Sequence, residues 1–224
     1  GQVHGAMQLD RLEQAMRAGS LVNVDHLDEL EDLEEMAFRL GRKLPVGIRV
    51  NLDAGISPMW TRFGFNLESG QAMEVASRIA DKGLLELKGL HCHLGTYIMD
   101  PGAYGRQAAT LAGLLRDIEM AYPFHLDYLD LGGGFPSASK LRNTYLPPDL
   151  SIPDMGEYAE ALCTALLAHL PPGRRPKLIL ESGRALVDEA GSVLTSVTAS
   201  KRLPDGTRAY VLDAGVNLLP TSAW

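Results

Sequence analysis

Three consecutive glycines follow a short apolar run and are the first residues in this sequence that could do chemistry. The run from Leu126 to Leu131 predicts a buried strand that ends at Gly132-Gly133-Gly134. Without β-carbons, such a segment can adopt positive φ angles and let a ligand approach the backbone closely. Successive N–H groups turned to one side form a concave site suited to a phosphate. The alternative is a tight turn with no ligand.

The next apolar strand carries charged residues at its end. Lys177 to Leu180 leads directly into Glu181-Ser182-Gly183-Arg184. Arginine suits bidentate phosphate binding, and phosphate sites after the last strands recur in (β/α)8 barrels. The two segments together favour a phosphate site at the ends of adjacent strands, although Glu181 and Arg184 could instead form a structural ion pair.

Two histidines, His91 and His93, are two residues apart on another predicted strand. Strand alternation would place both imidazoles on one face and Cys92 on the other. This spacing suits a metal site, a histidine stacked on a flat cofactor, or two core histidines. A metal would need further ligands at later strand ends, where only Asp130 and Glu181 are available, and the glycines would then have no role. We therefore expect no metal.

The elements that position these residues alternate between strands and helices. Apolar runs at 20–24, 45–52, 85–94, 126–131 and 177–180 predict strands, and apolar periodicity or caps predict helices around 7–16, 27–40, 72–79, 100–118 and 154–170. This order favours a parallel sheet of about five βα units, which is part of an α/β, (β/α)8-type barrel. An incomplete barrel should expose apolar edges. Arg49, inside the second strand, should meet a carboxylate or a ligand oxygen because an unpaired buried guanidinium is costly.

The pattern changes near Gly191. Ser192 to Lys201 alternates with a period of two, and Pro204-Asp205-Gly206 predicts a hairpin turn before a second strand from Ala209 to Leu212. We therefore expect two domains, a partial barrel over residues 1–190 and the beginning of an antiparallel β domain over residues 191–224.

Composition limits the classes of partner. The chain has 224 residues, 46% of them hydrophobic, and a formal net charge of −7. This acidic balance argues against nucleic acid or an anionic membrane as a partner, and no apolar run has the length of a membrane span. Cys92 and Cys163 lack metal-type spacing, so we expect free thiols and a cytoplasmic protein.

Four ordered segments, Gly89 to Thr96, Leu129 to Pro136, Glu181 to Arg184 and Val211 to Gly215, resemble those of the pyridoxal-phosphate-dependent decarboxylases with the alanine racemase fold. The similarity is greatest to the diaminopimelate and ornithine decarboxylase family and runs essentially end to end. It implies a pyridoxal 5'-phosphate cofactor, a small amino-acid substrate, carboxy-lyase activity and a homodimer.

The resemblance also implies roles for individual residues. His93 matches the histidine stacked on the pyridine ring, and Thr96 stands where a serine commonly bonds near the phosphate. Gly133 and Gly134 would give N–H groups to the phosphate, with Arg184 beside it.

The remaining implied positions lie nearer the ring. Glu181 matches the carboxylate at the pyridine nitrogen and Arg49 an arginine near the cofactor, while Ser182, in place of a usual proline, and Gly183 complete the cofactor-binding segment. A carboxylate keeps that nitrogen protonated and so strengthens the ring as an electron sink. Racemases of this fold have an arginine there, so Glu181 favours decarboxylation.

The sequence also departs from the family pattern. The family's cofactor-linked lysine belongs to an earlier strand, and neither Cys92 nor Cys163 stands in the motif of its catalytic cysteine. We therefore expect a piece of a longer protein, inactive alone, with no catalytic residue of its own. Tyr97 replaces a frequent glutamine, and Leu218 to Thr221 lacks an arginine typical of diaminopimelate decarboxylases, which leaves the substrate open.

Two other interpretations remain from the sequence. One is a non-catalytic or regulatory homologue that binds pyridoxal phosphate and has lost its lysine. The other is a metal-dependent barrel hydrolase that uses His91 and His93.

Overall fold

The computed structural model describes residues 2–4, 9–138, 147–188, 190–215 and 217–218. The chain divides into two compact units, Gly1–Asp188 and Glu189–Trp224, and each is considered by itself. Residues 219–221 lie outside the described residues. They belong to the segment that lacks the arginine typical of diaminopimelate decarboxylases.

The first unit is built on a parallel sheet. Its strands follow the chain order, which is the arrangement of successive βα units. They are β1 (Gln2–His4), β2 (Leu21–Val24), β3 (Leu44–Asn51), β5 (Leu85–His91), β6 (Tyr128–Asp130) and β7 (Lys177–Ile179), with the short β4 (Phe65–Asn66) paired to β3. The α/β class and the partial barrel are confirmed, with two strands more than expected, because β1 and β4, with three and two residues, are too short to show a pattern.

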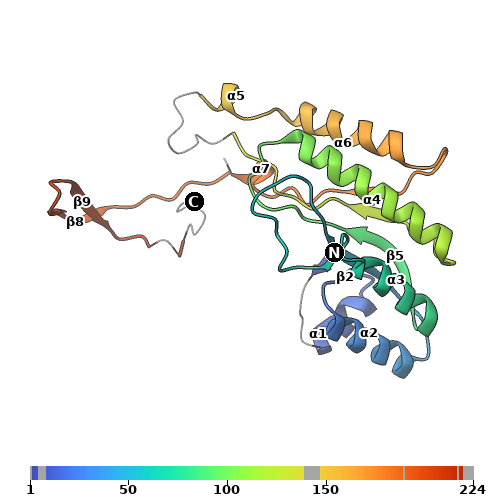
Figure 1. The fold of residues 1–224 in the computed structure, drawn as a ribbon. Coiled ribbons are helices and arrows are strands. Elements are labelled where there is room, and N and C mark those ends of the chain that lie inside the picture. Colours follow the sequence, from blue (N-terminus) through green and yellow to red (C-terminus); the bar gives the residue numbers. More distant parts are fainter. Residues whose placement is uncertain (1, 5–8, 139–146, 189, 216, 219–224) are drawn as a thin grey trace. The chain divides into compact units, whose positions relative to one another are not determined.

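Helices connect the strands. They are α1 (Leu9–Arg17), α2 (Leu27–Leu40), α3 (Gln71–Lys82), α4 (Pro101–Ala121), α5 (Pro148–Ser151), α6 (Met155–His169) and α7 (Arg184–Val187). Helices α4 and α6 lie side by side (Figure 1) and pack against each other extensively. Among the described residues, none of these helices combines the length and the apolar character needed to cross a membrane.

Caps explain why several helices begin and end where they do. The Asp100 side chain accepts a hydrogen bond from the Gly102 N–H, and Pro101 occupies the first turn of α4, as the sequence predicts. Helix α2 ends at Gly41, whose φ of 61° is the left-handed conformation that stops a helix. These caps determine where α2 ends and where α4 begins. They therefore also limit the length of the loops that connect these helices to the neighbouring strands.

The core around the sheet is filled by apolar side chains, with a buried polar contact between β2 and β6. The Tyr128 hydroxyl donates to Asn23 Oδ1 at 2.7 Å, and both residues are buried. The ring of Tyr128 lies against Gly89, where a β-carbon would be only 2.4 Å from it. The last strand of the sheet, β7, is less well covered: Leu178 on this strand and Leu180 just after it are exposed. The expectation that an incomplete barrel exposes an apolar edge is confirmed.

The second unit contains an antiparallel hairpin. Strands β8 (Val197–Arg202) and β9 (Arg208–Leu212) pair in antiparallel fashion. The turn holds Gly206 at a φ of 86°, and the Leu203 N–H donates to the Thr207 carbonyl across it. The hairpin predicted from the period-two pattern and the Pro-Asp-Gly turn is therefore confirmed.

The packing of Tyr128 generates a stability prediction. Gly89→Ala should lower the free energy of unfolding by about 1–3 kcal/mol, because a new methyl group would overlap the Tyr128 ring in a filled core. Gly113→Ala is the control: this helical position has nothing within 4 Å of its added β-carbon, and alanine favours a helix by about 1 kcal/mol. Urea unfolding compares the two. Equal stability of the variants would contradict this packing.

Candidate functional site

The glycine segment, Gly132 to Gly134, follows β6 and packs against the backbone of its neighbours. A β-carbon on Gly133 would lie 2.3 Å from the Glu181 carbonyl oxygen, and one on Gly134 would lie 2.3 Å from the Gly95 carbonyl oxygen. Gly134 also has a φ of 90°, which disfavours other residues. Any side chain here would therefore push apart the segments that follow β5, β6 and β7.

Backbone hydrogen bonds connect the same segments. The Glu181 N–H donates to the Gly132 carbonyl at 2.8 Å, and the Ile98 N–H donates to the Gly134 carbonyl at 2.9 Å. The Gly133 N–H donates to Nδ1 of His93 at 3.1 Å. The resemblance implied that this N–H binds phosphate, whereas in the structure it donates to the His93 imidazole.

A cationic end of the site is formed by Arg184, the first residue of α7. Its Nη2 atom donates to the Thr96 hydroxyl at 2.5 Å, and its guanidinium lies 5.1 Å from the centre of the Tyr97 ring. The Tyr97 hydroxyl in turn donates to the Ser137 carbonyl at 3.0 Å. Thr96 and Arg184, which sequence reasoning assigned to one phosphate site, are therefore in direct contact.

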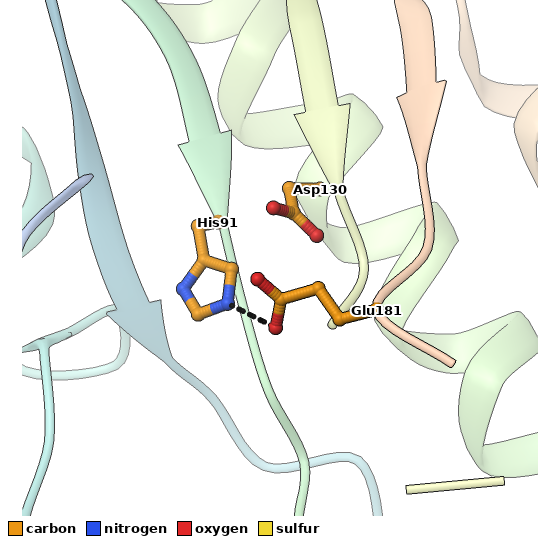
Figure 2. Close-up of side chains that lie close together, drawn as sticks. All are labelled: His91, Asp130 and Glu181. Carbon is orange, nitrogen blue, oxygen red and sulfur yellow. Dashed lines mark ion pairs between the residues drawn. The ribbon is translucent and has the colours of Figure 1, made fainter. Parts of the chain in front are cut away.

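An acidic end is formed by His91, Asp130 and Glu181, whose side chains point toward one another from β5, β6 and the segment after β7 (Figure 2). The His91 and Asp130 side chains meet because their residues are paired in register across the two strands. The Nε2 atom of His91 lies 3.5 Å from Oε2 of Glu181. His91 and Asp130 are buried, so the Glu181 carboxylate faces a buried imidazole and has a buried carboxylate nearby.

This acidic end bears on the metal alternative. Potential ligand atoms of His91, Asp130 and Glu181 all lie within 4.8 Å of one another. That group includes only one histidine of the predicted pair. His93 instead uses Nδ1 to accept the Gly133 N–H and lies with its ring 5.4 Å from that of Trp60. Strand β5 ends at His91, so the alternation expected to align the two histidines does not extend to His93.

Arg49 supplies a second positive charge. Its Nη1 atom lies 3.6 Å from Oδ1 of Asp25, and both side chains are 11% exposed. The guanidinium also lies 4.6 Å from the centre of the Phe63 ring. Burial lowers the pKa of Arg49, while the negative charges of Asp25 and Glu181 oppose that shift. The prediction that Arg49 meets a carboxylate is confirmed, and its field reaches Glu181.

Two aromatic residues of the site were not identified from the sequence. Trp60 lies in the loop after β3, and Tyr104 lies on the inner face of α4, where its hydroxyl donates to the Gly133 carbonyl at 2.9 Å. Tyr104 follows the apolar pattern of a helix, so only the unusual presence of a hydroxyl at a core position could have indicated its role.

Comparison with known proteins places this geometry in a family. The model of the pyridoxal-dependent decarboxylases, pyridoxal binding domain, matches residues 3–188. The chain belongs to this family. The cofactor of these decarboxylases is pyridoxal phosphate, and the acidic and cationic ends described above lie within the matched residues.

Curated relatives of this chain include diaminopimelate decarboxylases. That of Actinosynnema pretiosum subsp. auranticum is 34% identical over 194 residues, covering 81% of this chain and 40% of that protein. That of Neisseria meningitidis serogroup B is 32% identical over 213 residues, covering 92% and 48%. A crystal structure of diaminopimelate decarboxylase from M. jannaschii aligns with a TM-score of 0.78 at 26% identity, over 96% of this chain and 50% of that one. The chain thus spans about half the length of these relatives.

The two cysteines of the chain differ in their surroundings. Cys92 is buried beside the glycine segment, and burial raises the pKa of its thiol to about 12. Cys163, on α6, is exposed, and both cysteines are free.

This difference predicts their reactivity. Iodoacetamide at pH 8 should alkylate Cys163 and leave Cys92 unmodified in the folded protein, since a thiol needs both access and a thiolate form to react. Mass spectrometry of tryptic peptides measures the two sites separately. The denatured chain is the control, in which both must react. Rapid labelling of Cys92 under native conditions would show that this region is open.

Proposed function

We propose that this chain forms the cofactor-binding part of a pyridoxal-phosphate-dependent amino-acid decarboxylase whose intact form is longer. The observation that carries the proposal is the separation of charge across the strand ends, in a chain of this family. A carboxylate, Glu181, stands at one end, a guanidinium, Arg184, at the other, and an imidazole, His93, contacts the glycine segment that links them.

The chemistry of these groups fits the parts of the cofactor. The Arg184 guanidinium, the Thr96 hydroxyl and the Gly134 N–H suit a phosphate. The flat His93 ring suits an aromatic ring, and the Glu181 carboxylate suits a protonated pyridine nitrogen. Ser182 and Gly183 connect Glu181 to Arg184 along the chain. We propose these residues, with Gly133 acting through His93 and Arg49 acting through its charge, as the cofactor site.

When bound, pyridoxal phosphate supplies an electron sink for the charge left as carbon dioxide departs. In the proposed mechanism Glu181 holds a proton at the pyridine nitrogen. His91, 3.5 Å from Oε2 of Glu181, orients that carboxylate, and the positive charge of Arg49 interacts favourably with the negative charge of Glu181. The chain's own residues therefore set the charge at the nitrogen before the substrate arrives.

His93 is fixed as a neutral ring surface. Because its Nδ1 accepts the Gly133 N–H, the proton of the neutral imidazole resides on Nε2. The neighbouring Trp60 ring limits how far His93 can tilt. We infer that the His93 ring would pack against the aromatic ring of the cofactor and exclude water from that side, while Glu181 would bind its nitrogen.

The substrate class is an amino acid. Support comes from the names of the relatives, which are diaminopimelate decarboxylases, and from an M. jannaschii relative solved in complex with L-lysine. Tyr97 stands where the family frequently has glutamine, so which amino acid this protein takes is open.

We propose further that the intact protein is a cytoplasmic homodimer, with residues 1–190 as the pyridoxal-binding barrel part and residues 191–224 as the start of a β domain. The order of βα units and the antiparallel hairpin support this division. A regulatory homologue would share this cofactor site and would lack the lysine that binds the cofactor covalently. Release of carbon dioxide from a panel of L- and D-amino acids by the intact protein separates the two.

Replacing Glu181 tests the acidic end. In the intact protein Glu181→Gln should reduce the rate of carbon dioxide release by about a hundredfold, because an amide does not stabilise a protonated nitrogen, while the cofactor stays bound. Glu86→Gln, at an exposed carboxylate paired with Lys88 on β5, is the matched control and should leave the rate unchanged. An undiminished rate in Glu181→Gln would remove the role given to this carboxylate.

Replacing Arg184 tests the cationic end. Arg184→Ala should raise the dissociation constant for pyridoxal phosphate by about 10- to 100-fold, which corresponds to the loss of a charged hydrogen bond. The midpoint of urea unfolding should change little by comparison, since Arg184 is only half-buried. Arg116→Ala, an exposed arginine paired with Asp117 on α4, is the control. Equal cofactor affinity in the Arg184 and Arg116 variants would contradict the proposed phosphate site.

A further inference from the structure

A buried aromatic cluster lies under the glycine segment. The Tyr104 ring, from α4, stacks on Phe135 with ring centres 4.6 Å apart and an interplanar angle of 13°. On another side it meets the edge of Tyr158, from α6, at 5.4 Å. Tyr104 is fully buried. The cluster therefore leaves the Tyr104 hydroxyl little freedom to move.

The Tyr104 hydroxyl forms a hydrogen bond with the backbone of the glycine segment. It donates to the Gly133 carbonyl oxygen at 2.9 Å. Burial raises the pKa of Tyr104, so the group stays protonated and remains a donor throughout the physiological pH range. The contact would be costly to lose, because a buried carbonyl without a partner destabilises its surroundings.

The peptide unit carries this restraint to the next residue. The Gly133 carbonyl and the Gly134 N–H belong to one planar peptide, which is trans, and the two bonds point in opposite directions. A carbonyl directed at Tyr104 therefore turns the Gly134 N–H away from α4. With glycine on both sides, this peptide could otherwise rotate easily, because no β-carbon opposes the change.

Gly134 lies beside the groups of the cationic end. Its carbonyl accepts the Ile98 N–H at 2.9 Å, and its Cα faces the Gly95 carbonyl. Gly95 precedes Thr96, whose hydroxyl accepts from Arg184. Gly134 thus contacts Gly95 and Ile98, which lie on either side of Thr96 in the chain, and this places it near the residues that suit a phosphate.

We propose that Tyr104 is a positioning residue of the phosphate site. Its hydroxyl fixes the Gly133–Gly134 peptide so that the Gly134 N–H faces the phosphate of the cofactor. The inference rests on the proposed function, and it assigns to α4 a contribution that contacts no ligand. Phenylalanine would fill the same space, so the hydroxyl is the feature that matters.

The test compares two ligands that differ only in the phosphate. In the intact protein Tyr104→Phe should raise the dissociation constant for pyridoxal phosphate by about two- to tenfold, the equivalent of one hydrogen bond. The constant for pyridoxal, which lacks the phosphate, should stay the same. Tyr128→Phe is the control, since it removes a buried hydroxyl that donates to Asn23 instead, and it should leave the ratio of the two constants unchanged.

The outcomes are distinct. Equal weakening of both ligands by Tyr104→Phe would show a general loosening of the core and would overturn the proposal, as would equal affinities in Tyr104→Phe and the wild type. Failure of the wild-type protein to bind pyridoxal phosphate would instead overturn the proposed function.

A second measurement covers the case in which Tyr104→Phe does not fold. In wild-type protein labelled with 15N-glycine and freed of cofactor, inorganic phosphate should shift the NMR signal of the Gly134 amide. The Gly133 amide, which donates to His93, should move much less. A larger shift at Gly133 than at Gly134 would contradict the proposed direction of this peptide.

Discussion

The contact between the glycine segment and the backbones on either side of it is the constraint on which the candidate site depends. β-Carbons at Gly133 and Gly134 would each lie 2.3 Å from a carbonyl oxygen of a neighbouring segment. Backbone atoms cannot turn aside as a flexible side chain can, so the close approach requires glycine. This approach brings Glu181, His93 and the Gly95–Thr96 segment together at the ends of three consecutive strands. The site therefore depends on the neighbouring positions of β5, β6 and β7 in the sheet as well as on the chemistry of its side chains.

Charge is distributed unevenly over this compact region. Glu181 lies with His91 and Asp130 at the acidic end, while Arg184 contacts Thr96 at the cationic end. Both charges are half-buried, and such charges act more strongly than fully exposed ones. A ligand with a negative phosphate and a protonated ring nitrogen satisfies both ends at once, which is why the proposed function accounts for the arrangement.

Much of the fold could be predicted from local sequence signals. Gly41 stops α2, the Asp100-Pro101 pair starts α4, and the Pro-Asp-Gly turn produces the hairpin, because each acts within a few residues of the chain. The order of strands and helices followed from apolar periodicity. The ends of strands could not be predicted as well: β5 ends at His91 instead of continuing to Leu94, and the next carbonyl, that of Cys92, accepts a hydrogen bond from the Gln107 side chain.

Contacts between distant segments could not be predicted in this way. The bond from the Gly133 N–H to His93 joins residues 40 apart, and that from Tyr104 to the Gly133 carbonyl joins residues 29 apart. The sequence indicated that these glycines and His93 belong to one site, but a pattern of residue types carries no direction for an N–H group. The sequence likewise predicted that Arg49 meets a carboxylate or a ligand oxygen, but it did not indicate that Asp25 is the partner.

The central claim is that the strand ends hold pyridoxal phosphate by its two ends. A crystal structure of the intact protein grown with this cofactor tests it most directly. The account predicts the pyridine nitrogen within hydrogen-bonding distance of the Glu181 carboxylate and the phosphate against Arg184 and the Gly134 N–H. A cofactor bound elsewhere, or one whose nitrogen and phosphate contact other residues, would contradict it.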